Sequence, residues 1–257
     1  MNPRFDFPAH ELPLPAIRHI TAEHPLHWLR AGWADLRANP LPSLAYGLLF
    51  ALGGDLIILA VLDQPHLISV AVSGFFLVAP LLAAGLYELS RSHAQGEKLL
   101  FIDSLRCVRR NGQSLALFGL LLGLTMLFWE RVSAVTFALA AIDSPAMASA
   151  YLSDIILSGE HLAFTLSWLA AGGLLAFFIF ALSLVAVPMM LDHDTDVVTA
   201  MMTSLRAFSK NVGPLLLWAG LIVALTLFGF ATLLFGLVVI MPILGHASWH
   251  AYHDLVE

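Results

Sequence analysis

Charged residues are scarce in this sequence. Only 12% of its 257 residues are charged, whereas 59% are hydrophobic and the mean hydropathy is +0.85. A soluble domain carries about a quarter charged residues, and its folded surface must still offer water a polar face. We therefore expect an integral membrane protein, and this composition excludes a soluble enzyme.

Cysteine is nearly absent, and the 12 basic residues are outnumbered by 18 acidic ones. Cys107 is the single cysteine, which excludes an intramolecular disulfide and a multi-cysteine metal site. The net charge of −6 leaves no basic footprint for nucleic acid. No Ser/His/Asp order, glycine-rich phosphate loop or nucleotide motif is present. The sequence therefore predicts neither enzymatic activity nor nucleic-acid binding.

The N-terminal region has no long hydrophobic run. Residues 1–26 contain five prolines and scattered charges, whereas a secretory signal needs a basic start and an apolar stretch of about 7–15 residues. We predict that residues 1–26 form a flexible cytoplasmic tail. The first apolar span must then direct the chain to the membrane.

Long hydrophobic runs fill the rest of the chain. A helix crosses the membrane with about 20 mostly apolar residues. The runs of this kind are Ser43–Leu62, Leu67–Leu89, Ser114–Ile142 and Leu162–Leu191. A last block, Val212–Tyr252, is long enough for two crossings, with a break expected near Gly229–Thr232 because glycine and a β-branched residue weaken a helix. The prediction is an all-α polytopic membrane helix bundle of six transmembrane helices.

The distribution of basic residues predicts the orientation. Short cytoplasmic loops collect Lys and Arg. With the N-terminus inside, only Arg131 of the twelve basic residues falls outside. The inside set is Arg4, Arg18, Arg30, Arg37, Arg91, Lys98, Arg106, Arg109, Arg110, Arg206 and Lys210. We therefore predict that both termini of a six-span chain are cytoplasmic.

Residues 27–257 form a single predicted transmembrane domain with a threefold internal repeat, at about 27–96, 98–197 and 198–257. Each unit has an amphipathic stretch, typical of a helix in the headgroup layer, then an asparagine and a span. The asparagines are Asn39, Asn111 and Asn211, which we expect to N-cap the spans. Each unit closes with a span that contains one helix-kinking proline, namely Pro80, Pro188 and Pro242. The middle unit adds an outside segment, residues 130–161, with a short helix expected at about 146–157.

Charged residues within spans point to function, because they are costly in the bilayer. Asp55 lies in the outer half of the first span, and Glu130 and Arg131 lie toward the outer end of the third. These residues could form an ion pathway or a structural ion pair, or could extend toward interfacial water. The sequence leaves these interpretations open.

A second polar cluster is predicted at the cytoplasmic face. Counting four and eight residues from each repeat proline reaches Glu88, Asp192, His246 and His250. His246 and His250, at i and i+4, could bind a metal ion or haem; alternatively they belong to an interfacial belt or gate a proton-linked step. No cofactor is predicted. The run 192–196 resembles a calcium loop but lacks the required glycine and glutamate.

Several strings resemble a known bacterial family. They are Gly32-Trp33-Ala34-Asp35-Leu36, Tyr46-Gly47-Leu48, Pro80 with Ala84–Arg91 (Ala-Gly-Leu-Tyr-Glu-Leu-Ser-Arg), and Gly245–Tyr252 (Gly-His-Ala-Ser-Trp-His-Ala-Tyr). They resemble the predicted integral membrane proteins called domain of unknown function 2189, over about residues 25–256. The resemblance implies a bacterial cytoplasmic-membrane protein. It implies no established activity and no known site residues.

Three functions remain open from the sequence. The first is an accessory, scaffold or assembly component of a membrane complex, because the spans are rich in packing residues and poor in polar groups. The second is a small transporter or channel for an ion or small solute. The third is a membrane metal or haem binder through His246 and His250. The expected partner is the lipid bilayer, and another membrane protein complex is a candidate partner.

Overall fold

The computed structural model describes residues 14–61, 83–107, 111–143 and 161–257, and the elements in these ranges are helices. In chain order they are α1 (His24–Ala38), α2 (Pro40–Val61), α4 (Ala84–Ala94), α5 (Phe101–Cys107), α6 (Gly112–Asp143), α9 (Leu162–Ser183), α10 (Ala186–His193), α11 (Val197–Lys210), α12 (Val212–Ala231) and α13 (Leu237–Leu255). The predicted helix at 146–157 lies outside the described residues.

Four helical segments are long and apolar enough to cross a membrane. They are Pro40–Ile57, Gly112–Ala140, Leu162–His193 and Val212–Ala231, and as candidate spans they coincide with four of the predicted apolar runs. The predicted span Leu67–Leu89 lies largely outside the described residues, and α4 contains its described end. The break expected near Gly229–Thr232 is also confirmed, because α12 ends at Ala231 and α13 begins at Leu237.

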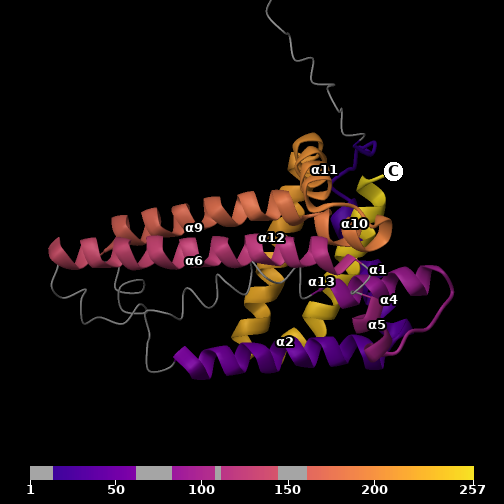
Figure 1. Cartoon of the computed structure of the whole chain (residues 1–257). Coiled ribbons are helices and arrows are strands. Elements are labelled where there is room, and N and C mark those ends of the chain that lie inside the picture. Colours follow the sequence, from indigo (N-terminus) through magenta and orange to yellow (C-terminus); the bar gives the residue numbers. More distant parts are fainter. Residues whose placement is uncertain (1–13, 62–82, 108–110, 144–160) are drawn as a thin grey trace, which may run out of the picture.

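Helix α13 is the centre of the described fold. It packs against α1, α2, α4, α10 and α12 (Figure 1). Two glycines allow this close packing: a Cβ at Gly47 of α2 would overlap the carbonyl of Val238, and one at Gly32 of α1 would meet the backbone of Ile243 and Ala247. The centre of the molecule is therefore a helix with a polar second half, held by backbone-to-backbone contact.

A short helix and a long helix follow one another three times, as α1–α2, α5–α6 and α11–α12. The short helices expose apolar side chains on the predicted lipid-facing surfaces, including Trp33 on α1 and Met202 on α11. The opposite face of α1, with Trp28, Gly32 and Asp35, is buried against α13. Each short helix can thus use its polar and small residues for packing and its apolar residues for lipid.

The asparagine between the short and long helix ties other segments together. Asn211 is the N-cap residue of α12, as predicted, but its side chain makes no cap hydrogen bond to that helix. Asn39 Nδ2 donates to the carbonyl of Leu99, and Asn111 Nδ2 donates to those of Met190 and Thr195. The amides are used this way because buried carbonyls of neighbouring segments need donors.

The repeat prolines have different positions in their helices. Pro80 lies outside the described residues. Pro188 lies in the first turn of α10, after the break at residues 184–185, where a missing N–H leaves no hydrogen bond unmade. Pro242 is inside α13, where it cannot donate to the carbonyl of Val238. Pro188 thus follows the turn at residues 184–185 that joins α9 to α10 within the candidate span Leu162–His193.

Part of the predicted flexible tail is ordered, which corrects the boundary at residue 26. Ile17 forms an antiparallel bridge with Val256, and Arg18 N donates to the carbonyl of Leu255 at 3.0 Å. Ile20 is buried, and its amide donates to Asn211 Oδ1 at 2.9 Å. The segment is held because these isoleucines bury apolar surface and its backbone groups find partners at the C-terminus.

Candidate functional site

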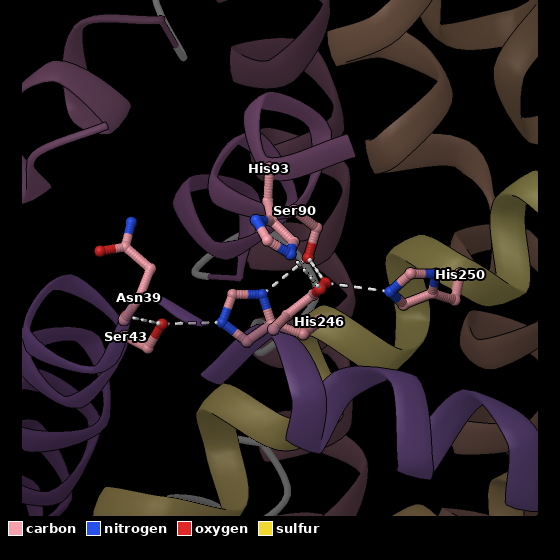
Figure 2. A network of polar contacts seen from close by, with 7 residues as sticks. Asn39, Ser43, Ser90, His93, His246 and His250 are labelled. Atoms are coloured by element: carbon pink, nitrogen blue, oxygen red, sulfur yellow. Dashed lines mark hydrogen bonds and ion pairs between the residues drawn. The ribbon is translucent and has the colours of Figure 1, made fainter. Parts of the chain in front are cut away.

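The candidate site lies where α1, α2, α4 and α13 meet. We call it the polar node, and it consists of Asn39, Asp35, Ser43, Ser90, His93, His246 and His250 (Figure 2). Helical spacing builds it from each side. Asp35 shares the buried face of α1 with Trp28 and Gly32, and His246 and His250 are one turn apart on α13. The node therefore joins four helices through side chains.

His246 lies at the middle of the node between two serines. Its Nε2 is 2.9 Å from Ser43 Oγ, and its Nδ1 is 2.7 Å from Ser90 Oγ. Ser43 Oγ donates to the carbonyl of Asn39 at 2.8 Å, and Ser90 Oγ donates to Asp35 Oδ2 at 2.7 Å. A continuous chain of hydrogen bonds thus runs from the α1–α2 junction to a carboxylate.

Asp35 is the charged end of this chain. Its side chain is buried, with 7% of the residue exposed. Its Oδ2 is 2.9 Å from His250 Nε2, and its Oδ1 is 3.8 Å from His93 Nε2. Burial alone would raise the pKa of Asp35, but hydrogen bonds from His250 and Ser90 and the nearby imidazoles hold this pKa below its ordinary value. Asp35 is therefore a carboxylate at neutral pH.

The hydrogen-bond chain constrains the protonation of His246. A neutral imidazole has one donor and one acceptor nitrogen. If Ser43 donates to Asn39 and Ser90 donates to Asp35, both ring nitrogens of His246 must donate, which requires an imidazolium. With a neutral ring, one serine must turn its hydroxyl toward His246. Burial lowers the pKa of His246 to about 4, so the ring is neutral at neutral pH and one serine hydroxyl points toward it.

The hydrogen bonds of the node bear on two other chemistries, nucleophilic catalysis and metal binding. Ser43 is completely buried, so a substrate cannot reach it as a nucleophile despite its hydrogen bond to His246. Both nitrogens of His246 are hydrogen-bonded to serines, and the described residues contain no group of three or more His, Cys, Asp or Glu side chains placed to hold a metal ion. In this arrangement Ser43 is closed to a substrate, and both ring nitrogens of His246 are engaged by hydroxyl groups.

The predicted cytoplasmic-face cluster is divided among separate partners. His250 contacts Asp35 directly, whereas His246 is linked to Asp35 through Ser90. Glu88 is buried and forms two hydrogen bonds with Arg91, one of them 2.9 Å long. Asp192 accepts from Tyr252 Oη at 3.0 Å. The cluster separates because successive helical positions of α4, α10 and α13 face different neighbours.

The charged residues within the spans also occupy separate places. Arg131 Nε is 3.0 Å from its neighbour Glu130. Asp55 is exposed on α2 and has no ion-pair partner among the described residues. Helix α6 packs against α9, α10 and α11, whereas α2 packs against α13, α1, α4 and α5. The structure thus pairs Glu130 with Arg131 and leaves Asp55 apart from them.

The acidic run at 192–196 also has a local structural role. Asp194 adopts a left-handed conformation, with φ at 49°, and ends α10. Asp196 N-caps α11, accepting from the amides of Val198 and Thr199 at 3.0 Å each. These hydrogen bonds, with that from the Thr199 side chain first, lower the pKa of Asp196. The run forms a helix-to-helix turn.

Sequence reasoning missed five members of the node as site residues, namely Asp35, Asn39, Ser43, Ser90 and His93, although it did single out Asn39 as a helix N-cap. Asp35 and Ser90 lie within the strings that carry the family resemblance, as do His246 and His250. Their common presence in these strings was the sequence feature that could have indicated that they belong to one site. Ser43 and His93 had none, because only the packing of α2 and α4 against α13 brings them to the node.

Comparison with known proteins gives one match. No curated protein and no solved structure matches this chain. One family model, described as a predicted integral membrane protein, matches residues 67–192. This range includes α4, with Ser90 and His93, and extends through most of α10. The predicted resemblance is therefore confirmed, and over residues 67–192 this chain matches the DUF2189 family of predicted integral membrane proteins.

Proposed function

We propose that this integral membrane protein is a non-enzymatic accessory, scaffold or assembly component of a complex in the bacterial inner membrane. One observation carries the proposal: the polar side chains that meet at α13 form a closed network, while α6 and α12 leave most of their apolar surface uncovered. Such surface is suited to lipid or to another membrane protein.

A threefold architecture supports this role. In the proposal, each of three units contributes an interfacial helix and a membrane hairpin, and both chain termini are cytoplasmic. The described sequence of α1–α2, α5–α6 and α11–α12 is consistent with the repeat. Repeated units that bury little of their spans present several similar faces, which suits the assembly of helices from other chains.

The experiment is purification of the tagged chain from its native membrane in a gentle detergent. Co-migrating proteins are identified by mass spectrometry, and the absorbance spectrum of the same fraction is recorded. A defined larger complex is expected, with the same partners in independent preparations. A chain that runs alone, and that moves a solute across liposomes by itself, would contradict the proposal.

A second candidate, a small transporter or channel, is favoured by the exposed carboxylate of Asp55 on an apolar span. This function predicts that Asp55→Asn abolishes flux in liposomes while expression is unchanged. Asp103→Asn, a change at an exposed pair with Arg106 outside the spans, is the control. Normal flux in Asp55→Asn would remove this pathway.

A further inference from the structure

The turn between α12 and α13 has an unusual composition for a loop. Residues 232–236 read Thr-Leu-Leu-Phe-Gly and contain no charged residue. Leu233 and Phe235 are 78% and 77% exposed. Leu233 and Leu234 have φ values of 52° and 65°, a left-handed conformation that favours glycine or asparagine. Leucine at both positions keeps the turn apolar where polar turn residues would fit the backbone better.

The backbone of this turn satisfies its own donors. Each amide N–H from Thr232 to Ile240 has an acceptor within the same hairpin. Thr232 Oγ1 accepts from the amide of Gly236 at 2.9 Å and donates to the carbonyl of Gly229 at 2.8 Å. A loop in water does not need internal hydrogen bonds for all of its backbone N–H groups, because water can accept from them. A loop in hydrocarbon does need them, because no solvent can replace the missing partners.

The packing of Leu234 gives the depth of the turn. Leu234 is 3% exposed and lies against Gly54 of α2, where an added Cβ would be 3.1 Å from its Cδ1. Gly54 is fourteen residues beyond the start of α2 at Pro40, or about 21 Å along a helix. The hydrocarbon core is about 30 Å thick. The turn therefore lies short of the far end of α2.

The length of α13 between the turn and the polar node also indicates how deep the turn lies. Nine residues separate its start at Leu237 from His246 in the polar node, a rise of about 14 Å, which is less than half of the hydrocarbon thickness. Figure 1 shows α6 and α9 extending well past α12 and α13 on the side away from the C-terminus. The α12–α13 hairpin is thus shorter than the α6–α9 pair in this view.

We propose that α12 and α13 form a re-entrant hairpin, with Leu233 and Phe235 at its tip among the lipid acyl chains. The hairpin enters and leaves on the side of the polar node. Its partner is the hydrocarbon interior of the bilayer, and the tip does not reach the opposite aqueous phase. This inference goes beyond the accessory role and replaces two full crossings by one partial insertion.

The same contact sets the depth of Asp55. Asp55 follows Gly54 on α2, and Gly54 packs against Leu234 of the turn, so in this proposal Asp55 lies at the depth of the tip. An ionisable residue at membrane depth, next to a hairpin that interrupts the bilayer, is typical of an ion or proton pathway. The re-entrant hairpin therefore gives Asp55 a specific environment to test.

Spin-label depth measurements test the hairpin. In the full chain with Cys107→Ser, a nitroxide is attached at Leu233→Cys, and its collisions with oxygen and with a water-soluble nickel chelate are compared in phospholipid vesicles. We expect high oxygen and low nickel accessibility. The matched control is Leu162→Cys, an exposed leucine at the start of α9, where nickel should be at least about tenfold more accessible. Equal nickel accessibility at both sites would overturn the proposal.

A second measurement uses the unaltered chain, so it does not depend on a substitution in the turn. Native vesicles are treated with a membrane-soluble carbodiimide or with a water-soluble one, and modified carboxyls are located by mass spectrometry, with Asp55→Asn as the control. Modification of Asp55 by the membrane-soluble reagent alone supports the membrane depth of the tip. Modification by the water-soluble reagent from either side would overturn it.

Discussion

Asp35 shows how single residues control the polar node. Its carboxylate accepts hydrogen bonds from Ser90 on α4 and from His250 on α13, although Asp35 itself lies on α1. A buried charge needs such partners, and removing one side of the network leaves the other side uncompensated. The node is therefore a joint between helices.

We predict that Asp35→Asn lowers the free energy of unfolding by about 3 kcal/mol. The pKa of Asp35 is lower in the folded chain than in the unfolded chain. The unfolded state therefore binds more protons in acid, so this contribution is fully present above the unfolded pKa, near 4, and is lost as the pH falls through the folded value. The measurement is thermal unfolding in detergent between pH 3 and 8.

Asp103→Asn is the control for this prediction, because Asp103 forms an exposed pair with Arg106 at 3.3 Å. An exposed pair of this kind contributes about 0–1 kcal/mol. An Asp35→Asn variant that unfolds at the same temperature as the control at neutral pH would show that the carboxylate does not hold the node together.

At the scale of elements, the central feature is the close packing of α13 against glycines of neighbouring helices. Pro242 deprives the carbonyl of Val238 of its helical donor, and Gly47 of α2 lies against this same carbonyl. A glycine is required here because no side chain fits between the two backbones. The proline and the glycine, nearly 200 residues apart in the chain, therefore form one packing feature.

Gly47→Ala should destabilise the fold by about 2 kcal/mol, in the range typical of overpacking. Its Cβ would overlap the backbone of Val238, which cannot move without shifting α13. Gly53→Ala on the same helix is the control, since an added Cβ there meets nothing within 4 Å, and alanine favours the helix. Denaturant unfolding should separate the two; equal stability would refute the close α2–α13 packing.

Asn211 joins the N-terminal segment to the start of α12. Its Nδ2 donates to the carbonyls of Arg18 and Ala207, and its Oδ1 accepts from Ile20 N. We predict that Asn211→Ala releases residues 16–20 and costs about 2 kcal/mol, because buried backbone groups lose their partners. Hydrogen exchange of these amides should become at least about tenfold faster. Gln113→Ala, at an exposed position of α6, should leave it unchanged.

At the scale of the whole molecule, the distribution of basic residues predicts the orientation. Eleven of the twelve Lys and Arg residues fall in the segments expected inside. A green fluorescent protein fused after Glu257 should fluoresce in the cytoplasm, and alkaline phosphatase fused after Asp143 should be active outside. The opposite pair of results would reverse the predicted topology, whereas the re-entrant hairpin leaves both expectations unchanged.

Several features could be predicted because they depend on local sequence. The four spans described in the structure follow from runs of apolar residues, and the break between α12 and α13 follows from Gly229 and Thr232. His246 and His250 could be placed on one face from their spacing. Their partner Asp35 could not, because it is 211 residues from His246 and no pattern in one chain links the two.

The sequence by itself determined that this protein lies in a membrane, since so much apolar surface has no other stable environment. It also determined the positions of the spans and the segregation of basic charge. Only the tertiary structure decided that Asp35, Ser90 and His246 form one hydrogen-bonded chain, that Asn211 binds the N-terminal segment, and that Leu234 packs on Gly54. The physical reason is range: helix formation and membrane partition depend on neighbouring residues, whereas hydrogen bonds and close packing depend on residues that meet only in the folded chain.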